Sequence, residues 1–483
     1  MATISSLGIG SGLDVESVIT KLMSVEQQPI NDIAQKTDGL KTKLSTYGQI
    51  QSSLSALRDA ASKLTSPDTW AGAKVSSSDA TALTAVASSG AAIGSVSISV
   101  SQLAAAQTLA SSTFSSPTAS IGQGSLTIEL GSWSTDANSG TTSFTSKPST
   151  TPVTIAIAPG QDQLTQIRDK INAAGAGVTA AVVTDATGSR LTLTSRTSGE
   201  SNAFRVTVND ADGNGGDASG LSQLAYDPST SVSQMSLSLP AANARAILNG
   251  LPISSETNSL TSAIDGLNIT LLRTIPPSQA VMLSVTQDAD AIKKAVTDFT
   301  TAYNAVNQLL RAQTKYDSSS KTAAPLQGDS TAVGLNNRLR GIVGGSTSMS
   351  TTLHRLADIG LAPGSDGNLP TTGAKLDGAL TNLTDLKAFF MGVDSNDGSN
   401  SGFATQIRSL VDQALSVDGS VSSRQKGLQA EIDSNNKRVD SLNDRAASTE
   451  KRLRAQYSAL DTKMSQYSSL SNYLTQQLAA LNK

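Results

Sequence analysis

Few residues of this 483-residue chain have side chains suited to catalysis or metal binding, since it holds one histidine and no cysteine. Without cysteine there is no disulfide, no thiol nucleophile and no Cys-based metal site. A Ser-His-Asp arrangement would have to use His354, which lies in the segment TTLHRLADIGL with no nucleophile elbow nearby. We therefore predict a structural role for His354, and a protein that is not an enzyme and uses no cofactor.

Two partial motifs resemble ligand sites. Asp210, Asp212 and Asn214 are spaced like the opening of a calcium-binding EF-hand loop, but position twelve of that loop is Leu221 rather than Glu. The glycine-rich segment SSLGIGSGL at 5–13 has no strand before it, which a phosphate-binding loop requires. We interpret the first as a solvated turn and the second as a flexible packing segment, and we predict no metal site.

Composition and charge exclude further classes. The net charge is −3 and no dense basic cluster occurs, which disfavours a nucleic-acid partner. No apolar run approaches the roughly 20 residues that span a bilayer, so we expect no membrane insertion. The opening MATISSLGIGSGLD has neither a basic n-region nor an apolar h-region, so no cleaved signal peptide is visible. An exported protein of this sequence would need another route.

The strongest pattern lies at the C-terminal end, from about Leu428 to Lys483, where neither Gly nor Pro interrupts the sequence. Its apolar residues recur every three or four positions, which predicts one long helix with a single apolar stripe. At 1.5 Å per residue this helix would extend about 80 Å, more than a globular domain needs. The stripe comprises Leu428, Ile432, Val439, Leu442, Ala446, Leu453, Tyr457, Leu460, Met464, Tyr467, Leu474, Leu478 and Leu481.

A partner for that helix is predicted at the start of the chain. Asp14 is a suitable N-cap for a helix that carries Val18 and Leu22, and Pro29 allows a bend before the next helix, which ends near Pro67. The same apolar rhythm continues through Ile30, Ile33, Leu40, Leu44 and Tyr47. We expect the two ends of the chain to meet, with the remaining sequence inserted between them.

Between the ends, the pattern alternates between strands and helices. Val96, Ile98 and Val100 alternate with Ser, and Asn249-Gly250 separates two apolar runs in the manner of a type I′ hairpin. A short helix at 164–171 is expected to open at Asp162, and the Ser/Thr-rich stretches at 131–150 and 209–220 are expected to be surface loops. From Asp288 the rhythm becomes helical again, with helices predicted near 331–343, 383–390 and 406–415.

These patterns predict an α+β multidomain protein with a terminal helical coiled coil, an α-helical bundle and two inserted β-rich domains. The predicted domains are 1–40 with 440–483 as a coiled-coil leg, 41–70 with 288–439 as the bundle, 71–112 with 241–287 as a β-rich domain, and 113–240 as an inserted β-rich outer domain.

Four segments resemble a known family. They are GIGSGLDVESVITKLMSVEQQPI at 8–30, LSVTQDADAIKKAVTDFTTAYNAVN at 283–307, LADIGLAPGSDGNL at 356–369, and LRAQYSALDTKMSQYSSLSNYLTQQLAAL at 453–481. In this order they resemble the flagellar filament-capping proteins, the FliD family of hook-associated proteins. The resemblance covers both ends and most of the helical part, whereas residues 113–240 share only a general likeness to β-rich modules of the family.

The resemblance implies a non-enzymatic protein that passes through the flagellar type III export channel and assembles as a ring at the filament tip, outside the cell. Its implied partners are further copies of itself, with a pentamer favoured, flagellin, a hook-associated junction protein, and an export chaperone on the C-terminal helix. The residues that we expect to contact other subunits are Val18, Leu22, Ile33, Leu40, Leu453, Tyr457, Leu460, Met464, Tyr467, Leu474 and Leu478.

Two alternatives stay open at this point. A hook–filament junction protein or a flagellin has similar terminal helices, but a flagellin would polymerise into filaments and a cap into closed rings. A surface adhesin would use the 113–240 insertion to bind host glycans through its polar loops.

Overall fold

The computed structural model describes residues 14–230, 232–372 and 375–481. They form two compact units, one built from both ends of the chain and one that comprises Ala71–Asp288. The first unit is helical, and the second consists mainly of antiparallel sheets. This confirms the predicted α+β class with long terminal helices and inserted β-rich parts. The exact domain boundaries given above remain predictions.

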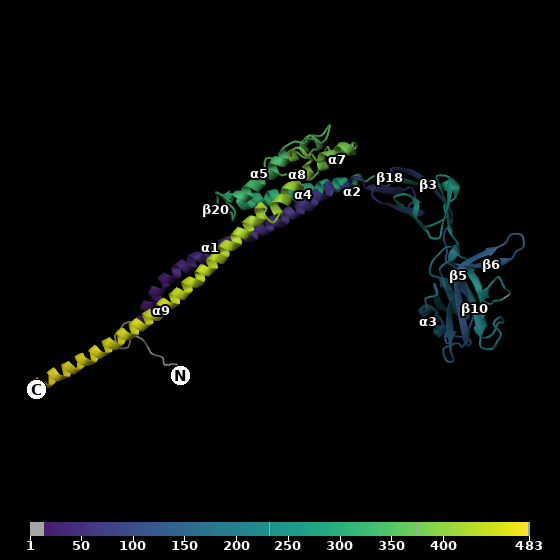
Figure 1. Ribbon diagram of the computed structural model, residues 1–483, viewed down its shortest axis with the longest axis horizontal. Helices are drawn as coiled ribbons and strands as arrows, with labels where there is room; N and C mark the ends of the chain where they lie inside the picture. The colour runs from purple at the N-terminus through teal and green to yellow at the C-terminus, as the bar shows by residue number, and fades with distance from the viewer. Residues whose placement is uncertain (1–13, 231, 373–374, 482–483) are drawn as a thin grey trace. The chain divides into compact units, whose positions relative to one another are not determined.

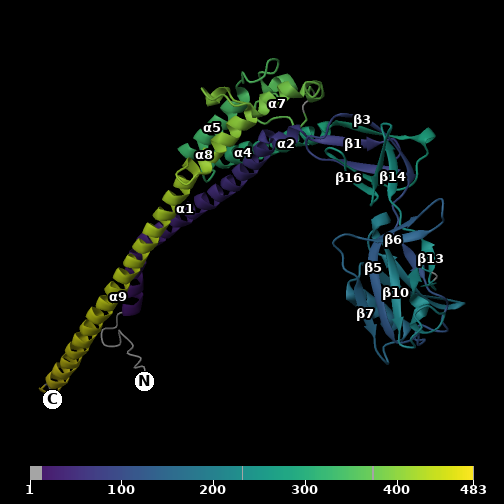
Figure 2. The ribbon, with the colours of Figure 1, turned by 45° about the vertical axis from the view of Figure 1, so that its right-hand side comes forward.

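Two long helices, α1 (Val15–Thr65) and α9 (Ser420–Leu481), form the frame of the helical unit and pack against each other (Figures 1 and 2). Asp14 caps α1 as predicted, since its Oδ1 accepts a hydrogen bond of 3.0 Å from the backbone N–H of Ser17. The predicted break near Pro29 is wrong, because α1 runs through that residue. Proline removes one backbone hydrogen bond, and the packing of the buried Ile30 next to it helps to offset that loss.

Shorter helices complete a bundle around the paired part of α1 and α9. The predicted helices near 331–343, 383–390 and 406–415 are confirmed, and α9 begins at Ser420, before the predicted Leu428. Their apolar faces share one core with α1, in which Tyr47, Phe299 and Phe390 are fully buried. The bundle helices are α2 (Pro67–Trp70), α4 (Ala289–Thr314), α5 (Ser330–Gly344), α6 (Leu376–Ala379), α7 (Leu383–Met391) and α8 (Phe403–Leu415), and the hairpin strands β19 (Tyr316–Asp317) and β20 (Thr322–Ala323) follow α4.

One polar cluster connects three helices inside this core. The Tyr47 hydroxyl of α1 donates a 2.6 Å hydrogen bond to Oδ1 of Asp329, and Arg424 Nε of α9 donates one of 3.0 Å to Oδ2. Asp329 also caps α5, accepting from the N–H groups of Thr331 and Ala332. Burial alone would raise the pKa of Asp329, but these hydrogen bonds outweigh it and the pKa is lowered.

The second unit has two separate cores. The first core lies between a five-stranded antiparallel sheet and a three-stranded one. The predicted pairing of 96–100 with the strand before Asn249 is confirmed, and Asn249 and Gly250 form a two-residue turn with φ of 49° and 87°. The strands are β1 (Ala73–Ser77), β18 (Val281–Gln287), β3 (Gly94–Gln102), β14 (Ala244–Leu248) and β15 (Leu251–Ser255) in the larger sheet, and β16 (Ser259–Ile264), β17 (Leu267–Leu271) and β2 (Leu83–Ala87) in the smaller.

The second core belongs to the insertion, where α3 (Leu164–Ala174) packs with the strands. Gln163, not Asp162, is the N-cap of α3, because the Asp162 side chain accepts a hydrogen bond from Ser120 instead. The strands are β12 (Val232–Ser233), β11 (Tyr226–Asp227), β10 (Ala203–Asp210), β5 (Gly124–Thr135), β6 (Thr142–Ser146) and β7 (Val153–Ile157) in one sheet, and β13 (Ser236–Leu239), β4 (Thr108–Ala110), β9 (Gly188–Ser195) and β8 (Val178–Asp185) in the other.

We expected the stretch at 131–150 to be a surface loop, but part of it forms strands. Its first residues extend β5 and Thr142–Ser146 form β6, which pairs with them. Thr and Ser serve well in an exposed strand, because their hydroxyls bond across the ladder, as those of Thr135 and Thr142 do at 3.0 Å.

Candidate functional site: the terminal helices

Helix α9 has two halves with different surroundings. Up to Tyr457 its stripe faces α1, and Leu428, Ile432 and Ala446 are buried. In the first turns of α1, which follow the N-cap Asp14, the apolar side chains of Val15 and Ile19 are buried. This part of α9 is thus paired with α1, and its many charged residues lie around the paired stripe.

Beyond Tyr457 the large apolar side chains of α9 are exposed. Seven large side chains in this half are 42–66% exposed, and the sequence has no Asp, Glu, Lys or Arg between Met464 and Asn482. Exposed apolar side chains in such number are typical of an interaction surface. We call it the distal stripe, which consists of Leu460, Met464, Tyr467, Leu470, Tyr473, Leu474 and Leu478.

The distal half remains helical through local bonds alone. Thr462 and Thr475 donate their hydroxyl hydrogens to the carbonyl groups four residues earlier, and Gln477 Nε2 donates to the Tyr473 hydroxyl at 3.2 Å. Such contacts satisfy polar side chains without adding a partner for the apolar ones. Because most helical stability in proteins comes from packing, a half-helix of this kind gains stability when its stripe is covered.

An ion-pair cluster marks the boundary between the two halves. Both terminal nitrogens of Arg454 donate to Glu16 at 2.7 Å, and its Nε donates to Glu450 at 2.8 Å. The hydrogen bond from Arg454 lowers the pKa of Glu16, and the two carboxylates raise that of Arg454. This bidentate pair holds the first turn of α1 against α9 at the last point where the two helices are paired.

The predicted interaction residues therefore separate into groups. Leu460, Met464, Tyr467, Leu474 and Leu478 are exposed together on α9, and Val18 and Leu22 are exposed on α1. Leu453 and Tyr457 are half-buried, as are Ile33 and Leu40, and Leu40 packs against the bundle core.

Three exposed apolar residues were missed by the stripe analysis: Leu470, Tyr473 and Val25. Each continues the three-and-four spacing, since Leu470 follows Tyr467 by three residues, Tyr473 follows Leu470 by three and Val25 follows Leu22 by three. The absence of charge around Leu470 and Tyr473 was the signal that could have included them.

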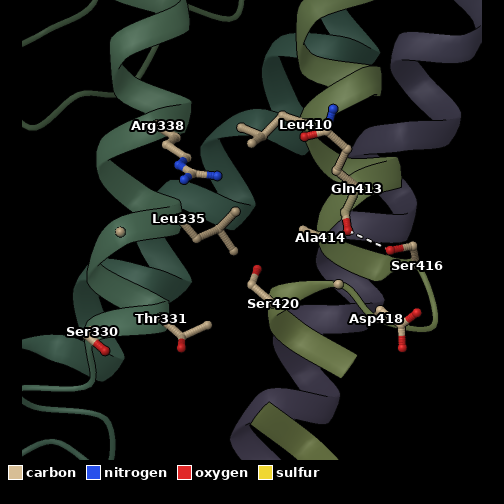
Figure 3. Close-up of a pocket in the computed structure, with 12 residues that line it drawn as sticks. Ser330, Thr331, Leu335, Arg338, Leu410, Gln413, Ala414, Ser416, Asp418 and Ser420 are labelled. Carbon is tan, nitrogen blue, oxygen red and sulfur yellow. Dashed lines mark hydrogen bonds between the residues drawn. The ribbon is translucent and has the colours of Figure 1, made fainter. Parts of the chain in front are cut away.

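Other candidate sites show no catalytic arrangement. One hollow of the bundle lies where α5, the end of α8 and the start of α9 meet; its volume is about 420 Å³, and Arg338 and Asp418 are its charged residues (Figure 3). His354 is exposed, and its Nδ1 lies 3.3 Å from the carbonyl oxygen of Thr347. The residues that line the hollow include no histidine or cysteine, and Asp418 is their only carboxylate.

The structure describes one of the two partial ligand motifs, the EF-hand-like segment that begins at Asp210. Asp210 is buried rather than solvated, because its Oδ2 accepts hydrogen bonds from both the N–H and the hydroxyl of Ser222. In the described ranges no group of three acidic, His or Cys side chains is placed to hold a metal ion. The glycine-rich segment 5–13 lies outside the described residues. None of the helices described here combines the length and apolarity needed to cross a bilayer.

Comparisons with known proteins match nearly the whole chain. Residues 11–107 match the family domain "Flagellar hook-associated protein 2 N-terminus" and 241–469 match its "C-terminus", while 134–197 match the "Flagellin hook IN motif". The last match lies in the insertion, where sequence reading found only a general likeness.

Full-length relatives and a solved structure agree with these matches. The chain is 31% identical to the flagellar hook-associated protein 2 of Escherichia coli K12, covering 99% of this chain and 98% of that one. It is 30% identical to the Salmonella typhimurium protein of the same name, covering all of both chains. The crystal structure of the D1-D2-D3 domains of the Escherichia coli flagellar cap protein FliD superposes with a TM-score of 0.61 at 29% identity, covering 80% of this chain and 99% of that one.

Proposed function

This chain belongs to the flagellar hook-associated protein 2 family, and from that premise we propose that it caps the flagellar filament. In this proposal several copies form a ring at the filament tip, with a pentamer favoured. The ring retains exported flagellin and promotes its folding and insertion. The protein acts outside the cell and performs no catalysis.

The observation that carries this proposal is the distal stripe. A helix end that exposes seven large apolar side chains and carries no charge from Ser465 to Leu481 is poorly suited to an isolated monomer in water. Covering the exposed part of each side chain is worth roughly 1 kcal/mol, so the stripe could supply several kcal/mol to an assembly. Helices of neighbouring copies and of flagellin subunits are the partners that we propose for it.

The chemistry of the stripe also suits a cap that must move as subunits are added. Charged flanking residues fix the register between paired helices, because a shifted register breaks their ion pairs. The distal half of α9 has such charges only near its start, at Asp461 and Lys463. It can therefore bind an apolar groove in more than one register, which favours stepwise movement over a fixed joint.

The same stripe needs cover before assembly. We propose that an export chaperone binds the C-terminal helix before transit through the type III channel, and that a hook-associated junction protein receives the cap before flagellin arrives. An uncharged helix end that is readily unfolded suits transit through a narrow channel, since little tertiary packing has to be broken.

The test replaces two stripe residues, Leu460 and Leu474, with Asp. We expect both units to stay folded while ring formation and filament growth are lost, because two charges would be desolvated at the docking face. Electron microscopy of the purified protein and motility of a strain that carries the variant as its only copy give the two readouts.

The matched control places the same two charges on the opposite face of the same helix, at Ser465 and Asn472, neither of which has a stripe residue three or four positions away. This variant should form rings and support motility. Normal filament growth with the Leu460→Asp, Leu474→Asp chain, or equal loss in the control, would contradict the proposed role of the stripe.

A further inference from the structure

A second candidate binding place lies in the insertion, far along the sequence from the terminal helices. It is a hollow of about 350 Å³ between the β5–β6 end of one sheet and the β13 strand of the other (strands labelled in Figure 2). Most of its wall is apolar or aromatic, from Trp133, Tyr226, Leu237, Pro228, Pro240 and Ala203.

The aromatic wall is rigid. Trp133 donates from Nε1 to the carbonyl oxygen of Phe204 at 3.3 Å, and the Tyr226 ring meets it edge to face with centroids 5.8 Å apart. Behind Trp133, the Phe144 ring lies 4.7 Å away with the Arg205 guanidinium over it at 4.9 Å. A wall fixed from behind in this way loses little conformational entropy when a ligand binds.

One polar group of this wall is left unused. Tyr226 is 6% exposed, and its hydroxyl makes no hydrogen bond with any described residue, although burial raises its pKa. The other polar side chains at the wall are engaged: Gln107 bonds both backbone groups of Phe204, and Glu200 pairs with Arg245. Since Tyr226 lines the hollow and its hydroxyl is not among the buried atoms without a partner, this hydroxyl is available to bond a ligand there.

An open strand edge borders the hollow. Strand β13 lies at the end of its four-stranded sheet and pairs with β4 on one side. All four of its residues are exposed, and Leu237, which is 46% exposed, also lines the hollow. The strand is short, with a register irregularity between Leu237 and Leu239 and Pro240 after it, which limits the length of strand that could be added. Its exposed leucines and the lack of charge over Ser236–Ala241 leave the remaining edge open to a short extended segment.

We propose that β13 and this hollow together bind an extended, uncharged polypeptide segment. The segment would add a strand to the β13 edge and place one apolar side chain against Trp133 and Leu237, with a backbone group bonded to the Tyr226 hydroxyl. A saccharide is less well matched, because sugars need several free donors and acceptors and most wall groups are apolar or already paired. This inference goes beyond the filament cap and depends only on the insertion.

The experiment uses the full chain labelled with 5-fluorotryptophan. The chain has two tryptophans, so fluorine NMR gives one signal for Trp133 and one for Trp70, which is buried in the helical unit and serves as internal reference. The probe is a capped heptapeptide of threonines with a central leucine. We expect a saturable shift of the Trp133 signal alone.

Altered probes and variants test each part of the proposal. A peptide with Asp in place of its leucine, and one with alternate amides N-methylated, should bind at least about tenfold more weakly, since they lack the apolar side chain or the edge donors. Leu237→Asp should abolish the shift and Tyr226→Phe should weaken binding several-fold. Leu251→Asp, at an exposed site on β15, should bind as the parent does.

Three results would overturn the proposal: equal binding of the N-methylated peptide, a shift by methyl glucoside or methyl galactoside at lower concentration than by the peptide, or no shift by any probe at several millimolar. A shift at lower concentration of a methyl glycoside would show that the hollow is a saccharide site. No shift by any probe would show that the hollow is structural only. Loss of capping in the stripe variants leaves this result unaffected, so the two proposals fail independently.

Discussion

Replacing Tyr47 with Phe should destabilise the helical unit by an amount that the geometry fixes. The side chain is fully buried, and its hydroxyl donates at 2.6 Å to a carboxylate of Asp329 that is 4% exposed. A hydrogen bond to a charged group is worth about 1.5–3 kcal/mol, and Asp329 retains its bonds to Arg424 and to the start of α5. We therefore expect a loss of about 2 kcal/mol in the free energy of unfolding.

Tyr303→Phe is the matched control. Tyr303 is equally buried in the same core, but its hydroxyl donates at 3.1 Å to a neutral acceptor, the Gly367 carbonyl oxygen. Its loss should cost about 1 kcal/mol. For a unit of this size, thermal unfolding followed by helical circular dichroism should show Tm falling by about 4–8 °C for Tyr47→Phe and 2–4 °C for Tyr303→Phe. Equal shifts in the two variants would refute the reasoning.

The pH dependence gives a second check on the same cluster. Since the folded-state pKa of Asp329 is lowered, its ionised form contributes stability that is present above the unfolded pKa of about 3.9 and is lost as pH falls through the folded value. Tyr47→Phe removes one of the bonds that lower this pKa. The difference in Tm between the parent chain and Tyr47→Phe should therefore narrow below about pH 4. The difference in Tm between the parent chain and Tyr303→Phe should stay constant.

Two further predictions concern local geometry. Glu16→Gln breaks the bidentate pair with Arg454, so amide hydrogen exchange in the first turns of α1 should speed up at low salt and differ little from the parent at high salt, where the pair is already screened. Gly250→Ala places a side chain at φ of 87° in the β14–β15 turn, so it should destabilise the second unit by about 1 kcal/mol in chemical unfolding. Gly39 lies inside α1, where an added Cβ meets nothing within 4 Å, so Gly39→Ala should stabilise the first unit by about 1 kcal/mol.

What the sequence predicted well was encoded locally. The three-and-four spacing of Leu428–Tyr457 located the stripe, Asp14 located the start of α1, and Asn249-Gly250 located a turn whose positive φ angles few other residues accept. In each case the signal lies within a few residues and depends on one physical requirement, either a face to bury, an N–H to cap or a conformation to permit.

The features that the sequence did not predict depend on contacts between residues far apart in the chain. Pro29 suggested a break, but the packing of α1 over its whole length compensates for one lost bond. Strand β6 carries no apolar alternation because it lies at an exposed edge, so its Ser and Thr looked like a loop. The wall of Trp133, Phe144 and Tyr226 joins residues from three strands, and no local pattern brings them together.

The contrast between the two halves of α9 supports different roles along one helix. Before Tyr457, the ion pair between Arg454 of α9 and Glu16 of α1 accompanies a buried stripe, as expected where two helices keep a single register. After it, apolar residues persist at the same spacing while charge disappears, so burial would still be favourable but nothing selects one alignment. A permanently paired helix would gain specificity from charges at these positions. Their absence lowers solubility, and it agrees with our proposal that the partner of this part of α9 changes during assembly.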